Sequence, residues 1–158
     1  MDKIAVFPGS FDPFTIGHES IVSRASKLFD KIYIAIGCNA QKDAFFSLEE
    51  RIKFINQVFE DNPTIEVTHF EGLTIDLCKK LNANYILRGL RTSADFEYER
   101  AIAQVNKAMY QGIDTVFFLT MPEHTPVNSS IVRDILRHGG DASKFIPSKM
   151  KIKNIHKK

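Results

Sequence analysis

The sequence predicts an α/β fold in which five parallel strands form one sheet with helices on both faces. Two observations support this prediction. Short apolar runs of strand type alternate with longer segments whose apolar residues recur at helical spacing. The 158 residues are the size of one ordinary domain, and no repeat, low-complexity segment or Gly/Ser-rich linker divides them. We therefore expect residues 1–158 to form a single domain.

Five short apolar runs are the expected strands. They are residues 4–8, 31–37, 64–70, 84–88 and 114–120. Helical segments separate these runs, and helical crossovers join strands that run parallel. Parallel sheets bind ligands outside the carboxyl ends of their strands, where the strand order reverses. The residues just after each strand are therefore the first candidates for a site.

The helical segments carry apolar stripes and recognisable end signals. They are residues 17–29, a segment opened by Ser47, residues 73–81, a segment from Thr92 or Ser93 to about residue 110, and residues 128–138. Ser47 and Glu50 have the spacing of a capping box, and Gly139-Gly140 is a stop signal. A short helix after Pro147 is expected to close the chain as a helical C-terminal tail.

Composition excludes several classes of protein. A net charge of +2 is too small to indicate nucleic acid or an anionic membrane as the main partner. No run is long enough to cross a bilayer, and the first residues lack the apolar region of a signal peptide. Cys38 and Cys78 form no CxxC motif and sit in apolar segments, so we interpret them as small core residues. These features favour a cytoplasmic protein.

The first loop, PGSFDPFTIGH at residues 8–18, has the chemistry of a phosphate site. Gly9 lets the backbone approach a ligand closely, and Ser10 offers a hydroxyl and an N–H group. His18 falls in the first turn of a helix, where free N–H groups and the helix dipole favour anions. Its ring could donate a hydrogen bond to a phosphoryl oxygen. The alternative is a turn with a capping histidine.

Two arginines, Arg88 and Arg91, follow the fourth strand and are well placed to clamp phosphates. Surface ion pairs are the alternative for them. The nearby carboxylates Asp95, Glu97 and Glu99 could neutralise these arginines, or could contact a base or Mg²⁺.

Asn128 is a good N-cap, and Ser129 and Ser130 add hydroxyls to the first turn of the last long helix. They predict a second anion site, with simple capping as the alternative. Lys42 lies in a polar loop after the second strand, where it could close over phosphates or stay solvated.

The familiar nucleotide and catalytic fingerprints are absent from the sequence. It contains no GxxxxGK[ST] motif and no GxGxxG motif, which excludes a Walker loop and argues against a dehydrogenase. It contains no GxSxG elbow. The histidines show no metal-ligand spacing with each other or with the cysteines, and His69 and His156 are interpreted as structural or exposed.

Taken together, six segments resemble bacterial phosphopantetheine adenylyltransferases, a family of the (H/T)xGH nucleotidyltransferase superfamily. The segments are PGSFDP at 8–13, TIGH at 15–18, SLEER at 47–51, RGLR at 88–91, DFEYE at 95–99 and NSS at 128–130. The resemblance runs from residue 4 to about residue 147. It implies a Rossmann-like fold, a homohexamer, and transfer of the adenylyl group of ATP to 4′-phosphopantetheine in the presence of Mg²⁺.

The resemblance also implies roles for individual residues. His18, Lys42, Arg91 and Ser10 would be catalytic. The remaining ATP contacts would be Gly9, Phe11, Gly89, Glu99, His124, Asn128, Ser129 and Ser130. The acceptor would be held by Leu73, Thr74, Arg88 and Asn106, with Ser10 and Lys42. No protein metal ligand is implied. Phe7 and Asn128 depart from the tyrosine and serine that are common in the family.

Two other functions remain open at this stage. A related nucleotidyltransferase could use another acceptor, such as nicotinamide mononucleotide or glycerol phosphate, although RGLR and DFEYE argue against it. A non-catalytic module could sense ATP or coenzyme A. The joint presence of Ser10, His18, Lys42 and Arg91 argues against a sensor, which need not keep a lysine on the transfer path.

Overall fold

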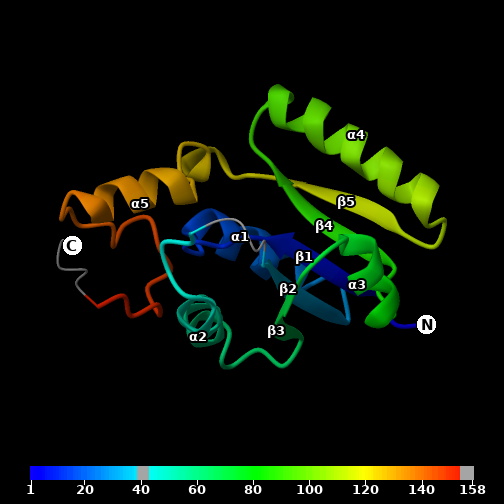
Figure 1. The fold of residues 1–158 in the computed structure, drawn as a ribbon, viewed down its shortest axis with the longest axis horizontal. Coiled ribbons are helices and arrows are strands. Elements are labelled where there is room, and N and C mark those ends of the chain that lie inside the picture. Colours follow the sequence, from blue (N-terminus) through cyan, green and yellow to red (C-terminus); the bar gives the residue numbers. More distant parts are fainter. Residues whose placement is uncertain (39–42, 154–158) are drawn as a thin grey trace.

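A computed structural model describes residues 1–38 and 43–153 (Figure 1). Five strands form one sheet in the order β3-β2-β1-β4-β5, and every pairing is parallel. The strands are β1 (Ile4–Gly9), β2 (Lys31–Gly37), β3 (Ile65–Phe70), β4 (Tyr85–Leu90) and β5 (Asp114–Leu119). The predicted parallel sheet is confirmed, with strand ends that differ from those expected by at most two residues.

The strand order reverses at β1, which lies between β2 and β4. The chain builds outward from β1 to β3, then crosses to β4 and β5 on the other side. β1 pairs with β2 at six positions, from Ile4 to Gly9, but with β4 only at Ala5 and Val6. The carboxyl ends of β1 and β4 therefore part from each other, which opens the sheet where ligands bind in folds of this kind.

Helices cover both faces of this sheet, as predicted. They are α1 (Ile16–Ala25), α2 (Leu48–Val58), α3 (Thr74–Lys80), α4 (Ser93–Met109) and α5 (Ser129–Arg137), with a 3₁₀ turn η1 (Pro122–His124) after β5. Side chains of α1 and α2 share a core with Ile32, Ile34 and Ile36 of β2. Side chains of α3 form a second core with Val6 and Ile86, on the opposite face.

The end signals in the sequence set most of the helix boundaries. Ser47 and Glu50 form the predicted capping box on α2, Thr92 caps α4, and Asn128 caps α5. The expected helix over 17–29 is too long, because α1 ends at Ala25 and a turn follows, in which the N–H groups of residues 28 and 29 both bond to the Ala25 carbonyl.

The C-terminal tail corrects a prediction. Residues 147–153 form a turn followed by a segment without regular secondary structure, not the helix expected after Pro147. Met150 is only 5% exposed and packs into the core beside α2, and the Lys151 N–H donates to the Gln57 side chain. A helix of so few residues has little stability of its own. The contacts with the core therefore decide the conformation of this segment. Residues 154–158, with His156, lie outside the described range.

The cysteine prediction holds for one residue. Cys78, on α3, is fully buried in the core, whereas Cys38, just after β2, is only partly buried. Both are free thiols. None of the helices in the described part of the chain is long and apolar enough to cross a membrane.

Candidate active site

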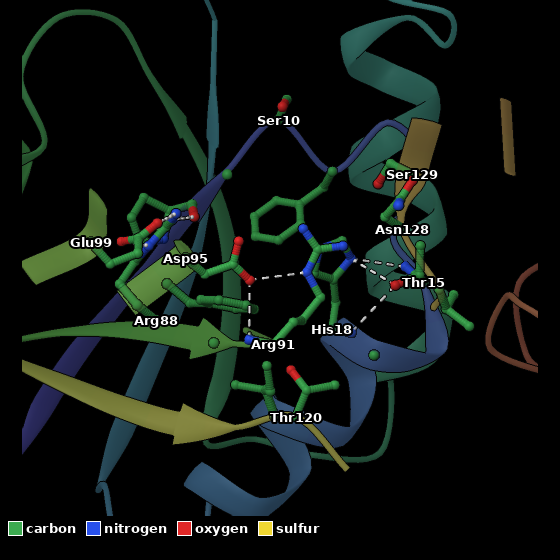
Figure 2. A pocket seen from close by; sticks show the side chains of 18 residues that line it. Ser10, Thr15, His18, Arg88, Arg91, Asp95, Glu99, Thr120, Asn128 and Ser129 are labelled. Atoms are coloured by element: carbon green, nitrogen blue, oxygen red, sulfur yellow. Dashed lines mark hydrogen bonds and ion pairs between the residues drawn. The ribbon is translucent and has the colours of Figure 1, made fainter. Parts of the chain in front are cut away.

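Two cavities open at the carboxyl ends of the strands, where β1 and β4 part. The first, of about 300 Å³, lies between the loop after β1, the start of α1, the end of β4 and the start of α5 (Figure 2). The second, of about 520 Å³, lies between the ends of β1 and β2, the start of α3 and one face of α4. They share a wall formed by Pro8, Gly9, Ser10, Arg88 and Glu99.

Most of the predicted site residues line these cavities. Those in the first are Gly9, Ser10, Phe11, His18, Arg88, Gly89, Arg91, Glu99, Asn128 and Ser129. Of the predicted acceptor residues, the second holds Ser10, Thr74, Arg88 and Asn106. Segments that are far apart in the sequence are thus brought together at the predicted edge of the sheet.

His18 has the capping role that the sequence left open as an alternative. Its Nδ1 accepts a hydrogen bond from the Thr15 backbone N–H at 3.0 Å, which completes a capping box at the start of α1. Because Nδ1 is the acceptor, the ring proton resides on Nε2. Capping therefore fixes the tautomer in which the other edge of the ring is a donor.

The surroundings of His18 keep the ring neutral. Burial, followed by the positive charges of Arg88 and Arg91, lowers the pKa of His18 from 6.5 to about 4. The burial comes from Phe7, Phe11 and Phe14, whose ring centroids lie 6.2, 5.0 and 5.2 Å from the imidazole. Near neutral pH the ring is thus a hydrogen-bond donor and not a cation.

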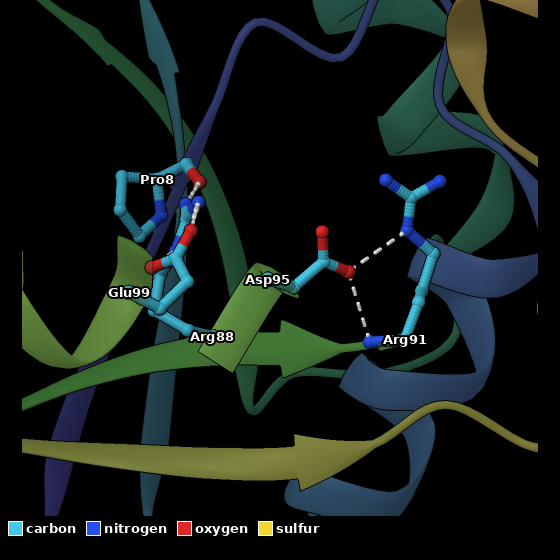
Figure 3. Close-up of polar contacts among 5 residues, drawn as sticks. All are labelled: Pro8, Arg88, Arg91, Asp95 and Glu99. Carbon is cyan, nitrogen blue, oxygen red and sulfur yellow. Dashed lines mark hydrogen bonds and ion pairs between the residues drawn. The ribbon is translucent and has the colours of Figure 1, made fainter. Parts of the chain in front are cut away.

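Arg88 is held rigidly on the shared wall (Figure 3). Its Nε and Nη2 donate to the two carboxylate oxygens of Glu99 at 2.9 and 2.6 Å, and its Nη1 donates to the Pro8 carbonyl at 2.8 Å. Glu99 is 8% exposed. Glu99, which the resemblance implies as an ATP contact, therefore has an arginine as its partner in this structure. This pairing is the alternative in which the nearby carboxylates neutralise the arginines.

Arg91 is held more loosely than Arg88. Its Nε lies 3.4 Å from the Asp95 carboxylate, and its backbone N–H donates to the same oxygen at 3.1 Å. Its side chain is 38% exposed. The two terminal nitrogens of the guanidinium extend beyond this contact (Figure 3), so they can bind an anion.

The start of α5 is confirmed as a capped helix. Asn128 accepts a hydrogen bond from the Ile131 N–H at 2.9 Å, and the Ser129 hydroxyl donates to the Pro13 carbonyl at 2.8 Å. Ser130 is exposed, bonds with Arg133 and does not line either cavity. Capping thus explains Asn128, while the Ser129 hydroxyl ties α5 to the first loop.

Two further predicted residues, Leu73 and His124, do not join the site in this structure, and a third cannot be placed. Leu73 is 56% exposed, and neither Leu73 nor His124 lines a described cavity. The buried His124 Nδ1 has no hydrogen-bond partner among the described residues. Lys42 lies outside the described residues.

Sequence reasoning missed part of the second cavity. Tyr98 and Ile102 line it together with Asn106, which the sequence did identify. Their spacing of four residues places all three on one face of α4, and that spacing could have revealed them. Cys38 also lines this cavity, and no feature of the sequence distinguishes it from a core residue.

Comparisons with known proteins show which family this chain resembles. Residues 6–135 match the cytidylyltransferase-like family. A phosphopantetheine adenylyltransferase of Flavobacterium psychrophilum is 54% identical over 94% of this chain and 98% of its own length. One of Bacteroides thetaiotaomicron is 47% identical over 94% and 97%. A putative nicotinate-nucleotide adenylyltransferase from Vibrio parahaemolyticus has the same fold, with a TM-score of 0.71 at 20% identity over 94% of this chain and 96% of that one.

Proposed function

Because the chain belongs to the cytidylyltransferase-like family, and within it to the phosphopantetheine adenylyltransferases, we infer that it transfers the adenylyl group of ATP to 4′-phosphopantetheine. The products are dephospho-coenzyme A and pyrophosphate. The identity of about half of all residues over nearly the full length places this chain with enzymes of that name.

One observation in the structure supports this function above the rest. Two cavities meet at the wall formed by Pro8, Gly9, Ser10, Arg88 and Glu99, and His18 and Arg91 line the first of them. A transfer between two substrates needs two adjoining pockets with charge-stabilising groups where they meet. We propose that ATP occupies the first cavity and 4′-phosphopantetheine the second.

The proposed chemistry needs no general base. The acceptor phosphate is anionic near neutral pH, attacks the α-phosphorus of ATP in line, and displaces pyrophosphate. The Nε2–H group of His18 would donate to an oxygen of the α-phosphate. Arg91 would bind the departing pyrophosphate, and Arg88 would bind the acceptor phosphate from the shared wall.

The remaining roles are proposals that rest on the family resemblance. Ser10 and Lys42 would contact phosphates of both substrates, and Thr74, Asn106 and Leu73 the acceptor. The other ATP contacts would be Gly9, Phe11, Gly89, Glu99, His124, Asn128, Ser129 and Ser130. For Glu99 and Ser129 the structure shows protein partners, so contact with ATP would involve atoms not committed to Arg88 and Pro13.

Mg²⁺ is proposed to arrive with ATP. Among the described residues no group of three or more His, Cys, Asp or Glu side chains could hold a metal ion. The two carboxylates of the first cavity, Asp95 and Glu99, are paired with arginines. Triphosphate oxygens and water, which Mg²⁺ favours, would therefore supply its ligands, and the ion would offset phosphate charge.

We also propose a homohexamer in the cytoplasm. Several large apolar side chains of α4 are exposed, among them Tyr98 (69%), Val105 (58%) and Met109 (48%). A surface of this kind is suited to contact with another subunit. The free thiols of Cys38 and Cys78 are compatible with a reducing compartment.

The proposed function is tested by measuring whether the release of pyrophosphate depends on the acceptor. The protein is incubated with ATP and Mg²⁺, with and without 4′-phosphopantetheine. We expect pyrophosphate only when the acceptor is present, in amounts equal to the dephospho-coenzyme A found by mass. Pyrophosphate without acceptor would instead indicate hydrolysis, and ATP binding without turnover would indicate the sensor.

A further inference from the structure

We propose that Arg51, at the start of α2, is a positioning residue for Ser10. This inference rests on the proposed function, because it concerns how the phosphate-facing loop after β1 is held. Arg51 is 7% exposed and lines neither cavity. Its Nη1 donates to the Ser10 carbonyl at 2.9 Å, and its Nε lies 3.4 Å from the Ser47 carbonyl, the N-cap of α2.

The hydrogen bond from Arg51 sets the direction of the Ser10–Phe11 peptide. With the Ser10 carbonyl directed to Arg51, the N–H group of Phe11 must point the opposite way, because the peptide is planar and trans. Among the described residues, neither this N–H group nor that of Ser10 has an acceptor within the protein. Backbone N–H groups in such a loop are the donors that a phosphate binds.

The loop needs this restraint because it is strained. Phe11 has a φ of 47°, a conformation that bulky side chains rarely adopt. Its ring folds back over Gly9, so closely that a Cβ on Gly9 would lie 2.9 Å from it. Strained backbone of this kind persists only where neighbouring contacts fix it.

The two sides of Phe11 are held by different contacts. Asp12 accepts hydrogen bonds from the N–H groups of Phe45 and Phe46 at 2.7 and 2.8 Å, and its own carbonyl accepts from Arg133 at 2.7 Å. These bonds hold residue 12, whereas Arg51 holds residue 10. Loss of Arg51 should therefore release Ser10 without unfolding the loop.

The charge of Arg51 also argues against a purely structural role. The ion pairs found among the described residues involve other side chains, so this buried guanidinium is bonded to carbonyl oxygens and not to a carboxylate. A buried charge without a counter-charge is a poor means of adding stability. The planar guanidinium of Arg51, with its several N–H donors, is however well suited to bind two carbonyl groups from different segments.

The test compares Arg51→Met, Arg51→Lys and Ser47→Ala. Ser47→Ala removes the α2 cap, which lowers stability by about 1 kcal/mol, but leaves the Ser47 and Ser10 carbonyls in place. Well below the melting temperature of each variant, we expect Arg51→Met to lower kcat about 10- to 100-fold, with a smaller change in KM for ATP. Arg51→Lys, which keeps the charge and can reach one carbonyl, should recover part of kcat, while Ser47→Ala keeps normal kcat.

Unchanged kcat in folded Arg51→Met, or an equal loss in Ser47→Ala, would overturn the proposal. If Arg51→Met does not fold, Arg51→Lys decides: it must lower kcat more than Ser47→Ala at equal stability. ATP binding by calorimetry separates this inference from the proposed function. If the wild type binds ATP without transferring it, the proposed function fails. Even in that case, weaker ATP binding in the Arg51 variants than in Ser47→Ala would support the positioning of Ser10 by Arg51.

Discussion

One edge of the His18 ring is committed to local structure, and the other edge is available for the proposed chemistry. Its Nδ1 caps α1 by accepting from Thr15, and this bond leaves Nε2–H as the donor on the other edge of the ring. Three phenylalanine rings and two arginines keep the ring neutral. A neutral donor can stabilise charge on a phosphoryl oxygen without giving up its proton.

His18→Gln separates the two roles of the histidine. Glutamine at the same helix position can still accept from the N-cap N–H group, so the capping box is kept. It lacks the ring, so we expect kcat to fall about 10²- to 10³-fold with little change in ATP affinity. Steady-state kinetics and ATP calorimetry would measure this, and near-normal kcat would refute the assigned role.

The lowered pKa of His18 also predicts a dependence of stability on pH. Well above pH 6.5 the ring is neutral in both folded and unfolded chains. As pH falls from 6.5 to about 4, the unfolded chain takes up a proton that the folded chain refuses, so stability is lost in this window. The loss amounts to up to about 3 kcal/mol.

Urea denaturation of wild type and His18→Gln at pH 7, 5.5 and 4.5 measures this effect. Carboxylates titrate in both proteins, so only the difference between them reports His18. We expect wild type to lose more stability than the variant as pH falls. Parallel pH profiles would mean that the ring protonates freely in the folded protein.

At the scale of elements, the site exists because β4 and β1 part while α1 stays packed against β4. Gly89 makes this packing possible, since a Cβ there would collide with Cδ1 of Ile21 on α1. Because the colliding atom is the end of a side chain that can change rotamer, Gly89→Ala should destabilise the protein by only about 1 kcal/mol. Ile21→Val removes the colliding atom, so the double variant should be more stable than the sum of the two single effects predicts. Simple additivity in denaturant unfolding would show that this contact does not limit the packing.

The cap of α5 gives a second test at this scale. Asn128 departs from the serine common in the family, yet it accepts the expected N–H hydrogen bond. Asn128→Ser should be nearly neutral, and Asn128→Ala should cost about 1 kcal/mol. Thermal unfolding of the two variants would measure this, and an unchanged stability of Asn128→Ala would show that the cap does not set the stability of α5.

The elements also show what the sequence could and could not predict. Hydrophobic period and capping residues predicted all five strands and the starts of α2, α4 and α5, because these signals are local. The helix predicted after Pro147 was wrong, since contacts of Met150 with residues of the core that are distant in the sequence decide the conformation of the tail. Likewise, the end of the fourth strand predicted where Arg88 lies. Only the fold shows that its guanidinium already donates hydrogen bonds to Glu99 and to the Pro8 carbonyl.

At the scale of the whole molecule, the exposed apolar side chains of α4 predict an assembly. Val105 is 58% exposed and lines neither cavity. If this helix lies in a subunit interface, Val105→Glu should yield a smaller species in light scattering. Leu28 is equally exposed, at 58%, on a different element. Leu28→Glu is therefore the matched control, and an unchanged mass for Val105→Glu would place the interface elsewhere.

The whole account depends on which acceptor fills the second cavity beside Arg88. The most direct measurement offers 4′-phosphopantetheine, nicotinamide mononucleotide and glycerol phosphate together, at equal concentration, with ATP and Mg²⁺, and identifies the products by mass. The account predicts dephospho-coenzyme A as the dominant product. A dominant adenylylated product of either other acceptor would contradict it, and would assign this cavity to a different substrate.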